Sequence, residues 1–448
     1  MATNNSAGQF TADIEAYIAQ ETLPLARRQL VAYQFGDPET LPKGRGTSFT
    51  ATRYNRVPLP FQPLSEGVPP NGQTMTIGQV TVTLQQWGDR INITDVAEMT
   101  IKHPIMNEAK KIIALQTAEL LERNTFNTYG GFTQVNYVNS RGSRGALVAG
   151  DVLNTYEISR AYVQLVNLGA PRYMGDEMTN TKLAADAGGA KASDSPRSRP
   201  HYVAICHPFV EGDLTQNSTF VLAASYSDIN RLYNYEIGEW HGIRFCSTNL
   251  CPTFTGVATL SGTAATTGAL ATNTYFVTIT ASDSQNQYES RVYAVSGGIA
   301  VTGPTGSITV VLPALPGFTF NAYIGLTATP TNLALSAAGP VVGPQTGQAV
   351  QMAPGQTVTL TNIGAAQTAP AAPAVGVTVY PTYIFGRGAY AQVMLDDIKI
   401  AYLPNADKSD PLNQLRIIGW KVFYGTLIKN NLFAMRIESA SAFNAAFG

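Results

Sequence analysis

The feature that most constrains this chain is a window of 124 residues, Pro252–Val375, that is nearly free of charge. Its only Asp, Glu, Lys, Arg or His side chains are Asp283, Glu289 and Arg291. Charged residues make up 13% of the whole 448-residue chain, whereas an average soluble protein has roughly 25%. So little charged surface predicts that the protein covers much of its surface with copies of itself.

The window carries the pattern of short strands. Thr, Ala, Gly, Val and Pro dominate it, and apolar and polar residues alternate in runs separated by turn residues. The clearest runs are Thr274–Thr280, Arg291–Val295, Ser307–Leu312 and Thr357–Thr361. Short strands at regular spacing favour an all-β sandwich. Because the window ends in a Pro/Ala linker, Thr368–Val375, we interpret it as a discrete domain inserted into another fold.

The residues on either side of the window predict mixed α and β structure. Thr11–Phe35 has amphipathic helical spacing. Two β-type stretches follow, Thr47–Tyr54 and Met75–Thr94, and between them lie the prolines Pro58, Pro60, Pro63, Pro69 and Pro70. Proline cannot donate to a strand ladder, so this segment predicts a long extended hairpin or arm rather than part of a core.

The strongest helix prediction covers Pro104 to Tyr129. Proline suits the first helical position, and Gly130 and Gly131 end the helix. Apolar residues recur at helical spacing, namely Met106, Ala109, Ile113 and Leu120. At 1.5 Å per residue such a helix is about 39 Å long. That length exceeds the diameter of a small domain.

Further elements follow along the chain. We expect a second helix over Asp151–Leu168, with Asp151 as its cap, and a breaker-rich flexible loop over Ala184–Pro200. The remaining predictions are a buried strand (Tyr202–Cys206), a helix or turn (Ala223–Tyr233), and three strands in the tail separated by a loop at Pro404–Pro411 (Ile398–Leu403, Arg416–Phe423 and Leu432–Ser439).

Charge and composition exclude several classes of function. The net charge is −1, so the chain cannot neutralise many phosphates and is no ordinary nucleic-acid-binding protein. No stretch approaches 18 consecutive apolar residues, so we expect no transmembrane helix and no membrane partner. Three cysteines are too few for a disulfide framework, and their odd number favours folding in a reducing compartment.

The chain carries no motif for catalysis or metal binding. It has neither a G-x-S-x-G nucleophile turn nor a phosphate-binding P-loop. Adjacent carboxylates at Asp396–Asp397 face opposite sides of a strand, which favours a solvated edge over a shared site. The histidine and cysteine spacings do not match zinc ligand pairs and favour buried core cysteines (His201, Cys206, His207, His241, Cys246 and Cys251). We therefore expect no enzyme, no metal and no cofactor.

One group of charged residues is a candidate for contacts between subunits. Arg53, Arg56, Glu66, Asp89 and Arg90 lie on or at the ends of the predicted arm, in a chain that otherwise uses charge sparingly. Alternating signs on an extended element suit pairing with a neighbouring subunit. Ordinary solvated charge is an equally good reading of the same spacing.

Several stretches, taken in order, resemble major capsid proteins of tailed bacteriophages, and specifically the N-four-like phage capsid family. These stretches are Leu30–Gly46 (LVAYQFGDPETLPKGRG), Thr52–Gln73 (TRYNRVPLPFQPLSEGVPPNGQ), Gln86–Asp95 (QWGDRINITD), Ile384–Val393 (IFGRGAYAQV) and Asp410–Glu438 (DPLNQLRIIGWKVFYGTLIKNNLFAMRIE). Each motif is loose by itself, and their shared order over most of the chain outside the window carries the resemblance.

The resemblance implies an α+β chain with the Hong Kong ninety-seven type capsid fold. Its parts would be an N-terminal arm (residues 1–45), an extended loop (46–98), and peripheral and axial domains (99–251 and 376–448), with Pro104–Tyr129 as the spine helix. The family pattern does not require residues 252–375, which are closer to immunoglobulin-like domains that decorate virions. We expect this all-β insert on the outer surface.

The function that the resemblance implies is structural. It is that of a major capsid protein, whose copies form pentamers and hexamers of an icosahedral shell around double-stranded DNA. Partners would be other copies of the chain, separate scaffolding, portal and decoration proteins, and packaged DNA in weak, non-specific contact. The location would be the virion, after synthesis in the host bacterial cytoplasm. The alternative from the residues is an oligomeric surface adhesin or a glycan-binding decoration protein, with the β-rich window as its binding domain.

Overall fold

A computed structural model describes the chain over residues 31–54, 57, 59, 63, 72–95, 105–173, 200–217, 220–222, 233, 235–283, 289–336, 339–340, 355–403 and 414–444. Four predictions fall on the residues between these ranges. They are the helix Thr11–Phe35 as far as residue 30, most of the loop Ala184–Pro200, most of Ala223–Tyr233, and the loop Pro404–Pro411. These parts lie outside the described residues.

The helical elements are few and the strands many. The helices are η2 (Ala32–Phe35), α2 (Ile105–Tyr129), η3 (Val138–Ser140), η4 (Arg144–Ala146), α3 (Thr155–Asn167), α5 (Pro208–Thr215) and η9 (Asn431–Phe433). The strands before residue 250 are β1 (Asp37–Thr40), β2 (Ser48–Tyr54), β3 (Ile77–Thr83), β4 (Gln85–Thr94), β5 (Val135–Tyr137), β6 (Tyr202–Cys206), β7 (Val221–Leu222), β8 (Glu236–Trp240) and β9 (Ile243–Ser247).

The strands after residue 250 fall into two sets. The first set is β10 (Phe254–Val257), β11 (Gly262–Leu270), β12 (Asn273–Asp283), β13 (Glu289–Tyr293), β14 (Ile299–Val301), β15 (Gly306–Val311), β16 (Phe318–Gly325), β17 (Asn332–Ser336), β18 (Gly339–Pro340) and β19 (Thr357–Ala366). The second set is β20 (Thr378–Phe385), β21 (Tyr390–Leu403), β22 (Leu415–Ile428) and β23 (Ala434–Ser439).

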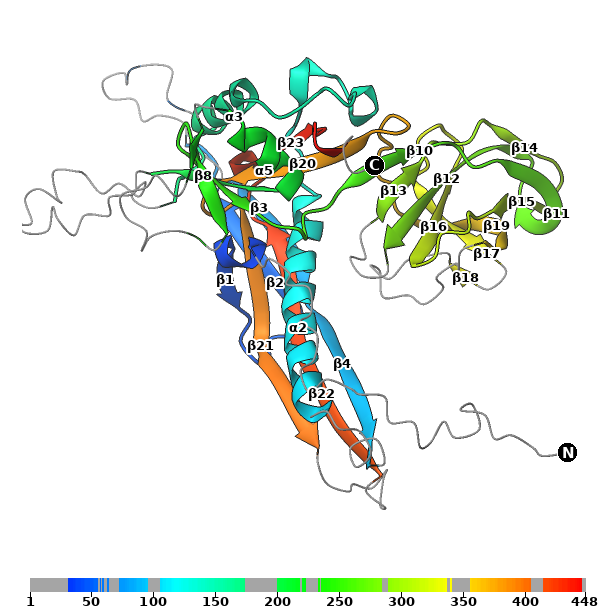
Figure 1. Cartoon of the computed structure of the whole chain (residues 1–448), viewed down its shortest axis with the longest axis horizontal. Coiled ribbons are helices and arrows are strands. Elements are labelled where there is room, and N and C mark those ends of the chain that lie inside the picture. Colours follow the sequence, from blue (N-terminus) through cyan, green and yellow to red (C-terminus); the bar gives the residue numbers. More distant parts are fainter. Residues whose placement is uncertain are drawn as a thin grey trace, which may run out of the picture.

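The longest part of the molecule is a stalk made of α2 and a 4-stranded sheet in the order β1-β21-β22-β4 (Figure 1). Alternate residues of β22 face α2, and Ile418, Trp420 and Val422 are buried there. They meet the apolar stripe of the helix, which includes Ala109 and Ile113. The 25 residues of α2 extend about 37 Å, so the helix covers the sheet along most of the stalk.

The second part, the head, is a sheet in the order β5-β23-β20-β6-β9-β8-β7 with helices on both faces. Even-numbered residues of β6 pack against α3 and α5, while Val203 and Ile205 face the carboxyl end of α2 and η2. Every residue of β6 is buried, as the sequence predicted for Tyr202–Cys206. The strand is buried on both faces because each face has a helical layer.

The third part is the inserted unit, which we define as residues 252–375, and it lies to one side of the head (Figure 1). Its strands form one hydrogen-bonded ladder in the order β11-β15-β19-β17-β16-β12-β13-β10. The ladder curls around its own apolar core, in which Ile279, Ile308 and Phe320 are buried. The described residues of the window form strands, as the sequence predicted, and the narrower immunoglobulin-like likeness stays a prediction.

The two ends of the inserted unit leave the head side by side. The Gly256 amide donates to the carbonyl of Val377, and the Gly376 amide donates to the carbonyl of Gly256, both at 2.9 Å. A side chain at Gly256 would come within 2.2 Å of the Ala374 carbonyl oxygen, so the close approach requires glycine. The expectation that both ends lie close together is confirmed.

The structure corrects two details of the local predictions. The cap of α3 is Asn154, whose side chain accepts from the Glu157 amide, and the predicted cap Asp151 instead accepts hydrogen bonds from Asn139, Arg141 and the Val148 amide. The stretch Met75–Thr94 divides at Leu84. Its first half, β3, pairs with β2, but its second half, β4, pairs with β22 in the stalk.

We predict that stalk stability depends on the face of β22 beneath α2. Replacing Ile418, which is fully buried, by Ala should lower the free energy of unfolding by about 2–5 kcal/mol. The matched control is Ile400→Ala on neighbouring β21, where the side chain is 59% exposed and the expected change is within about 0.5 kcal/mol. Urea denaturation of unassembled subunits measures both, and equal effects would contradict the packing described here.

Candidate assembly surfaces

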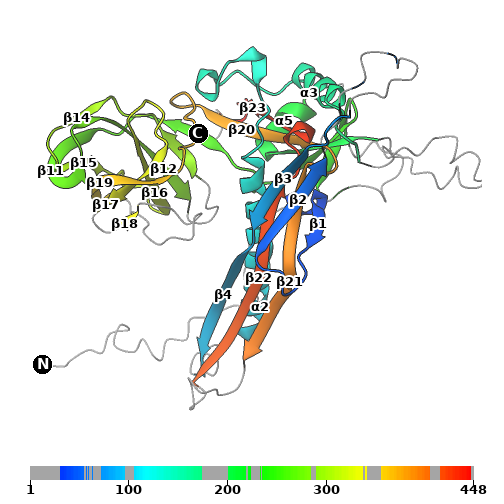
Figure 2. The same cartoon turned by 180° about the vertical axis from the view of Figure 1, so that it is seen from behind.

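The β2–β3 hairpin forms a third layer over the stalk sheet, on the face opposite α2. Figure 2 shows both strands crossing in front of β21 and β22 near the head. One side of the hairpin packs through Phe49, Ala51 and Val82 against a cluster that includes Val393 and Leu427. The base of the predicted arm is therefore packed against its own subunit, whereas the sequence predicted an arm apart from any core.

The far end of the hairpin is apolar and uncovered. Tyr54 is 64% exposed, Met75 64% and Ile77 53%. Tyr54 and Ile77 are paired residues of the ladder, so their side chains lie together on one face. Contiguous apolar side chains at the end of a projecting element are typical of a protein–protein contact.

The five charged residues predicted for subunit contacts do not form one group. Arg53 lies exposed on β2, while Asp89 and Arg90 lie on β4 in the stalk sheet. The Asp89 carboxylate accepts from Gln116 Nε2 on α2 at 2.7 Å, which ties it to its own subunit. Arg53 and Arg90 make no ion pair with any described residue. Arg56 and Glu66 lie outside the described residues, and the interface role of all five stays a prediction.

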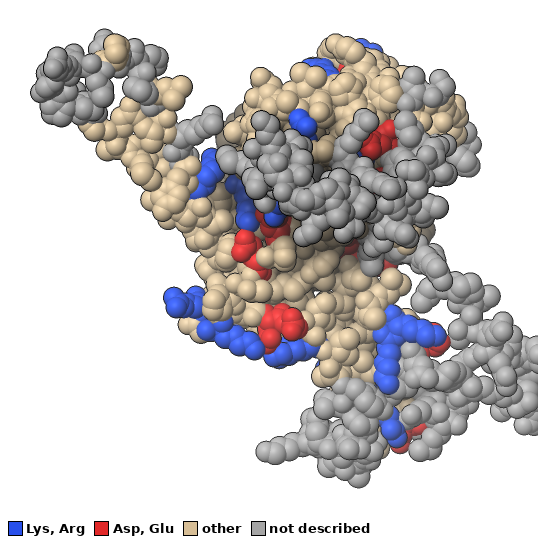
Figure 3. All heavy atoms as spheres, turned by 90° about the vertical axis from the view of Figure 1, so that its left-hand side faces the viewer, with Lys and Arg blue, Asp and Glu red and all other residues tan. Residues whose placement is uncertain are grey.

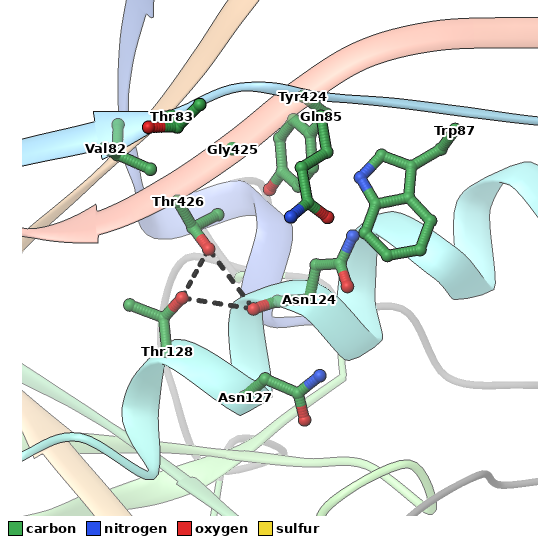
Figure 4. Close-up of a pocket in the computed structure, with 10 residues that line it drawn as sticks. All are labelled: Val82, Thr83, Gln85, Trp87, Asn124, Asn127, Thr128, Tyr424, Gly425 and Thr426. Atoms are coloured by element: carbon green, nitrogen blue, oxygen red, sulfur yellow. Dashed lines mark hydrogen bonds between the residues drawn. The ribbon is translucent and has the colours of Figure 1, made fainter. Parts of the chain in front are cut away.

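A polar groove of about 280 Å³ lies where the hairpin base, β4 and α2 meet (Figure 4). The carboxamides of Gln85, Asn124 and Asn127 line it, together with the ring of Trp87. None of these three carboxamides has a hydrogen-bond partner among the described residues. At the floor of the groove, the hydroxyls of Thr128 and Thr426 bond to each other and to the Asn124 carbonyl. Sequence patterns do not predict this groove, because its residues come from segments about 300 positions apart.

The edge strand β4 runs alongside this groove. In the described part of the chain β4 pairs with β22 alone, so its other edge is available to a further strand. An unpaired strand edge is a template for another strand. The charges of Asp89 and Arg90 limit indiscriminate pairing at this edge.

The backbone of residues 31–33 is held by one buried carboxylate on α2. Glu122 Oε1 accepts from the amides of Val31 at 2.7 Å and Ala32 at 2.6 Å, and Oε2 accepts from the amide of Tyr33 at 2.9 Å. Glu122 is fully buried, and no ion pair reaches it from the described residues. Burial raises the pKa of its carboxyl, while the three amides act in the opposite direction.

Two tyrosines extend this anchor. The Tyr129 hydroxyl donates to the Tyr390 hydroxyl at 2.8 Å, and the Tyr390 hydroxyl donates to the Ala32 carbonyl at 2.7 Å. Side chains of α2 and β21 therefore bind the three amides and the Ala32 carbonyl of the backbone segment 31–33. Burial raises the pKa of both tyrosines far above the usual range, so they stay neutral.

Charged side chains on the surface lie in small groups of mixed sign (Figure 3). Asp396 pairs with Lys399 at 2.5 Å and Lys43 at 3.2 Å, and hydrogen bonds from these two lysines lower the pKa of its carboxyl to about 2. Lys429 pairs with Asp37 and Glu39, which tie β1 to β22. On the face drawn in Figure 3, the described Lys, Arg, Asp and Glu side chains therefore form no large patch of a single charge sign.

The three cysteines and His201 belong to the core, whereas His241 is exposed. Cys206, Cys246 and Cys251 are free and buried, and burial raises the pKa of each thiol. His201 is buried against the Tyr233 hydroxyl, and burial lowers the pKa of His207 to about 4. Among the described residues no three His, Cys, Asp or Glu side chains converge as a metal site would need. The reading of these cysteines as core residues is confirmed.

No described helix is long and apolar enough to cross a membrane.

The fold is that of phage capsid proteins of the Hong Kong ninety-seven type. The chain is similar to the capsid of Ralstonia phage GP4 with a TM-score of 0.52 and 9% identity over 98% of both chains. The head of Helicobacter pylori bacteriophage KHP40 gives 0.47 and 8% identity over 98% of both chains. The capsid of cyanophage Pam1 gives 0.45 and 10% identity over 99% of this chain and 100% of that one.

The predicted fold class is thereby confirmed. No protein-family model and no curated protein matches the sequence. The narrower resemblance to the N-four-like family therefore stays a prediction.

We predict that Glu122 anchors the arm through its oxygens. In Glu122→Ala, the amides of residues 31–33 should exchange with solvent about tenfold to a hundredfold faster, because each loses a hydrogen bond to a charged acceptor. In Glu122→Gln, one carbonyl oxygen still accepts from Val31 and Ala32, so the Tyr33 amide alone should lose protection. Residue-resolved hydrogen exchange checks both variants.

The difference in unfolding free energy between the parent chain and Glu122→Gln should depend on pH. A carboxyl whose pKa is raised in the folded state stabilises the fold most below its unfolded pKa, and that contribution is lost as pH rises through the folded pKa. The unfolding free energy of the parent chain, relative to Glu122→Gln, should therefore fall as pH increases above about 4.5. A difference that does not change with pH would contradict the burial of an ionisable Glu122.

Proposed function

We propose that this chain is a major capsid protein whose copies assemble into pentamers and hexamers of an icosahedral shell around phage double-stranded DNA. The observation that carries the proposal is the full-length similarity of fold to the Ralstonia phage GP4 capsid. The role is structural and needs no catalysis. The alternative of a surface adhesin is left as an outcome of the tests below.

Assembly rests on extended elements that leave one subunit and reach another. The hairpin offers Tyr54, Met75 and Ile77, and the stalk offers the free edge of β4 beside unpaired carboxamides. Each contact is small, but every subunit repeats it around a closed shell, so the contacts act multivalently. Arg53 and Arg90 serve as further contact residues on these elements, together with Arg56, Glu66 and Asp89.

We assign residues 1–45 to the arm, 46–98 to the extended loop, and 99–251 and 376–448 to the peripheral and axial domains. The projecting part of the extended loop is the β2–β3 hairpin. Residues 252–375 face outward. An inward position would place a nearly uncharged surface against packaged DNA, where it has no attraction for phosphate.

The same charge argument applies to DNA, and the other partners are those that the resemblance to capsid proteins implies. With a net charge of −1, contact with packaged DNA is weak and non-specific. Scaffolding, portal and decoration proteins are separate chains. The protein is made in the host bacterial cytoplasm and ends in the virion.

The hairpin gives the first test. The double variant Tyr54→Ser/Ile77→Ser should fail to close shells, because each subunit loses two apolar side chains worth about 1.5–3 kcal/mol each when fully buried. Its unfolding midpoint as a subunit should not change, since both side chains are exposed. The control is Val311→Ser on the inserted unit, 61% exposed, which should still close shells. Electron microscopy of purified protein decides, and closed shells from the double variant would overturn the hairpin's role.

Removal of the inserted unit gives the second test. A short Gly/Ser linker from Gly256 to Gly376 should retain folding and shell closure, because these two residues are already hydrogen-bonded to each other. Density on the outer surface should disappear. Lost density on the inner surface would contradict the outward position. A small discrete oligomer with affinity for glycans, formed by the full chain in place of shells, would favour the adhesin.

A further inference from the structure

The inserted unit meets the head at one buried guanidinium. Arg144 lies in η4, outside the inserted unit, and is 5% exposed. Its Nη1 donates to the carbonyl of Ala371 at 3.1 Å, in the linker that returns to the head. Its guanidinium carbon lies 4.0 Å from the centre of the Phe254 ring, in the strand that leaves the head. One side chain of the head therefore contacts both connections.

The other side of Arg144 is fixed to the head sheet. Nε donates to Glu438 Oε2 at 2.7 Å and Nη2 donates to Glu438 Oε1 at 2.5 Å, so the pair is bidentate. Glu438 lies in the middle of the head on β23 and is fully buried. Arg436 forms a second ion pair with it at 2.9 Å. A bidentate pair fixes direction as well as distance, which a single lysine ammonium cannot do.

Packing beside this contact is incomplete. A cavity of about 320 Å³ lies between the head and the inserted unit, lined by Arg144, Arg436 and Glu289 as well as aromatic rings. Glu289 is bound within the inserted unit by Asn321 and Tyr323, and no ion pair links it to either arginine. Besides Arg144, the contacts that join the two parts here are the short pairing of β10 with β20, the bond between the Thr255 and Thr378 hydroxyls, and the backbone bonds of Gly256 and Gly376. These bonds lie along the two connections themselves, so Arg144 is the side chain that joins both connections to Glu438 of the head sheet.

We propose that Arg144 sets the orientation of the inserted unit by fixing both of its connections to Glu438 of the head sheet. The unit is then a rigid extension of the head and not a tethered domain. This property belongs to the single subunit, so it holds whether or not the chain forms shells.

Hydrogen exchange on the full-length subunit tests the proposal. The amides of Gly256 and Gly376 donate to backbone carbonyls within the two connections. In Arg144→Ala they should exchange about tenfold to a hundredfold faster, because opening of the connections no longer has to break the charged hydrogen bond from Arg144 to Ala371. In Arg144→Lys, the charge remains but the bidentate geometry is lost, so an intermediate effect is expected. The control is Arg141→Ala, which removes an ion pair from the same loop but has no contact with either linker.

Two further measurements separate orientation from folding. The double variant Arg144→Met/Glu438→Gln replaces the Arg144–Glu438 ion pair by neutral side chains, and the glutamine oxygen can still accept from Arg436, so it should fold even where Arg144→Ala does not, and it should show the same faster exchange. In assembled particles of either variant, the shell should stay ordered while density for residues 258–366 weakens. Linker exchange and domain density equal to those of the parent chain in the folded double variant would overturn the proposal.

Discussion

The burial of one face of β22 beneath α2 determines the architecture. The helix runs beyond the head along the stalk (Figure 1), so part of it would expose its apolar stripe if no sheet accompanied it. The 14 residues of β22 supply that cover, and β21 and β4 pair with it on either side. Once the stalk exists, its opposite face accepts the hairpin and its upper end holds the arm at Glu122. The positions of the hairpin and of residues 31–33 therefore both depend on this single contact between the helix and the sheet.

Local patterns in the sequence predicted local structure well. The spine helix, the strand Tyr202–Cys206 and the all-β window follow from periodicity and composition, which the chain carries within short segments. The division of Met75–Thr94 at Leu84 did not follow, because β3 and β4 have similar β-type residues and differ only in partner. Those partners, β2 and β22, lie about 30 and 330 residues away along the chain.

The candidate surfaces were harder to predict, for a different reason. Glu122 lies in an amphipathic helix, where an acidic residue is usually solvent-facing, and nothing near it in sequence marks a backbone segment that it would bind. Asp89 accepts from Gln116 of α2 within the same subunit, a contact that its position in the sequence did not indicate, and its interface role stays a prediction. Arg144 gave no signal either, because its partners Glu438 and Ala371 are each more than 200 residues away. The molecule has few charged residues, and which of them bind other parts of the structure depends on contacts that form only in the folded chain.

The strand β10 has a mechanical consequence. It pairs with β20 of the head and with β13 of the inserted unit, so peptide hydrogen bonds run without interruption from one to the other. A force that pulls on the inserted unit passes along this strand into the head sheet. The load then reaches β6 and β23 directly, both of which pair with β20, and bypasses the exposed hairpin and its contacts. The inserted unit can therefore bear strain that does not pass through the β2–β3 hairpin.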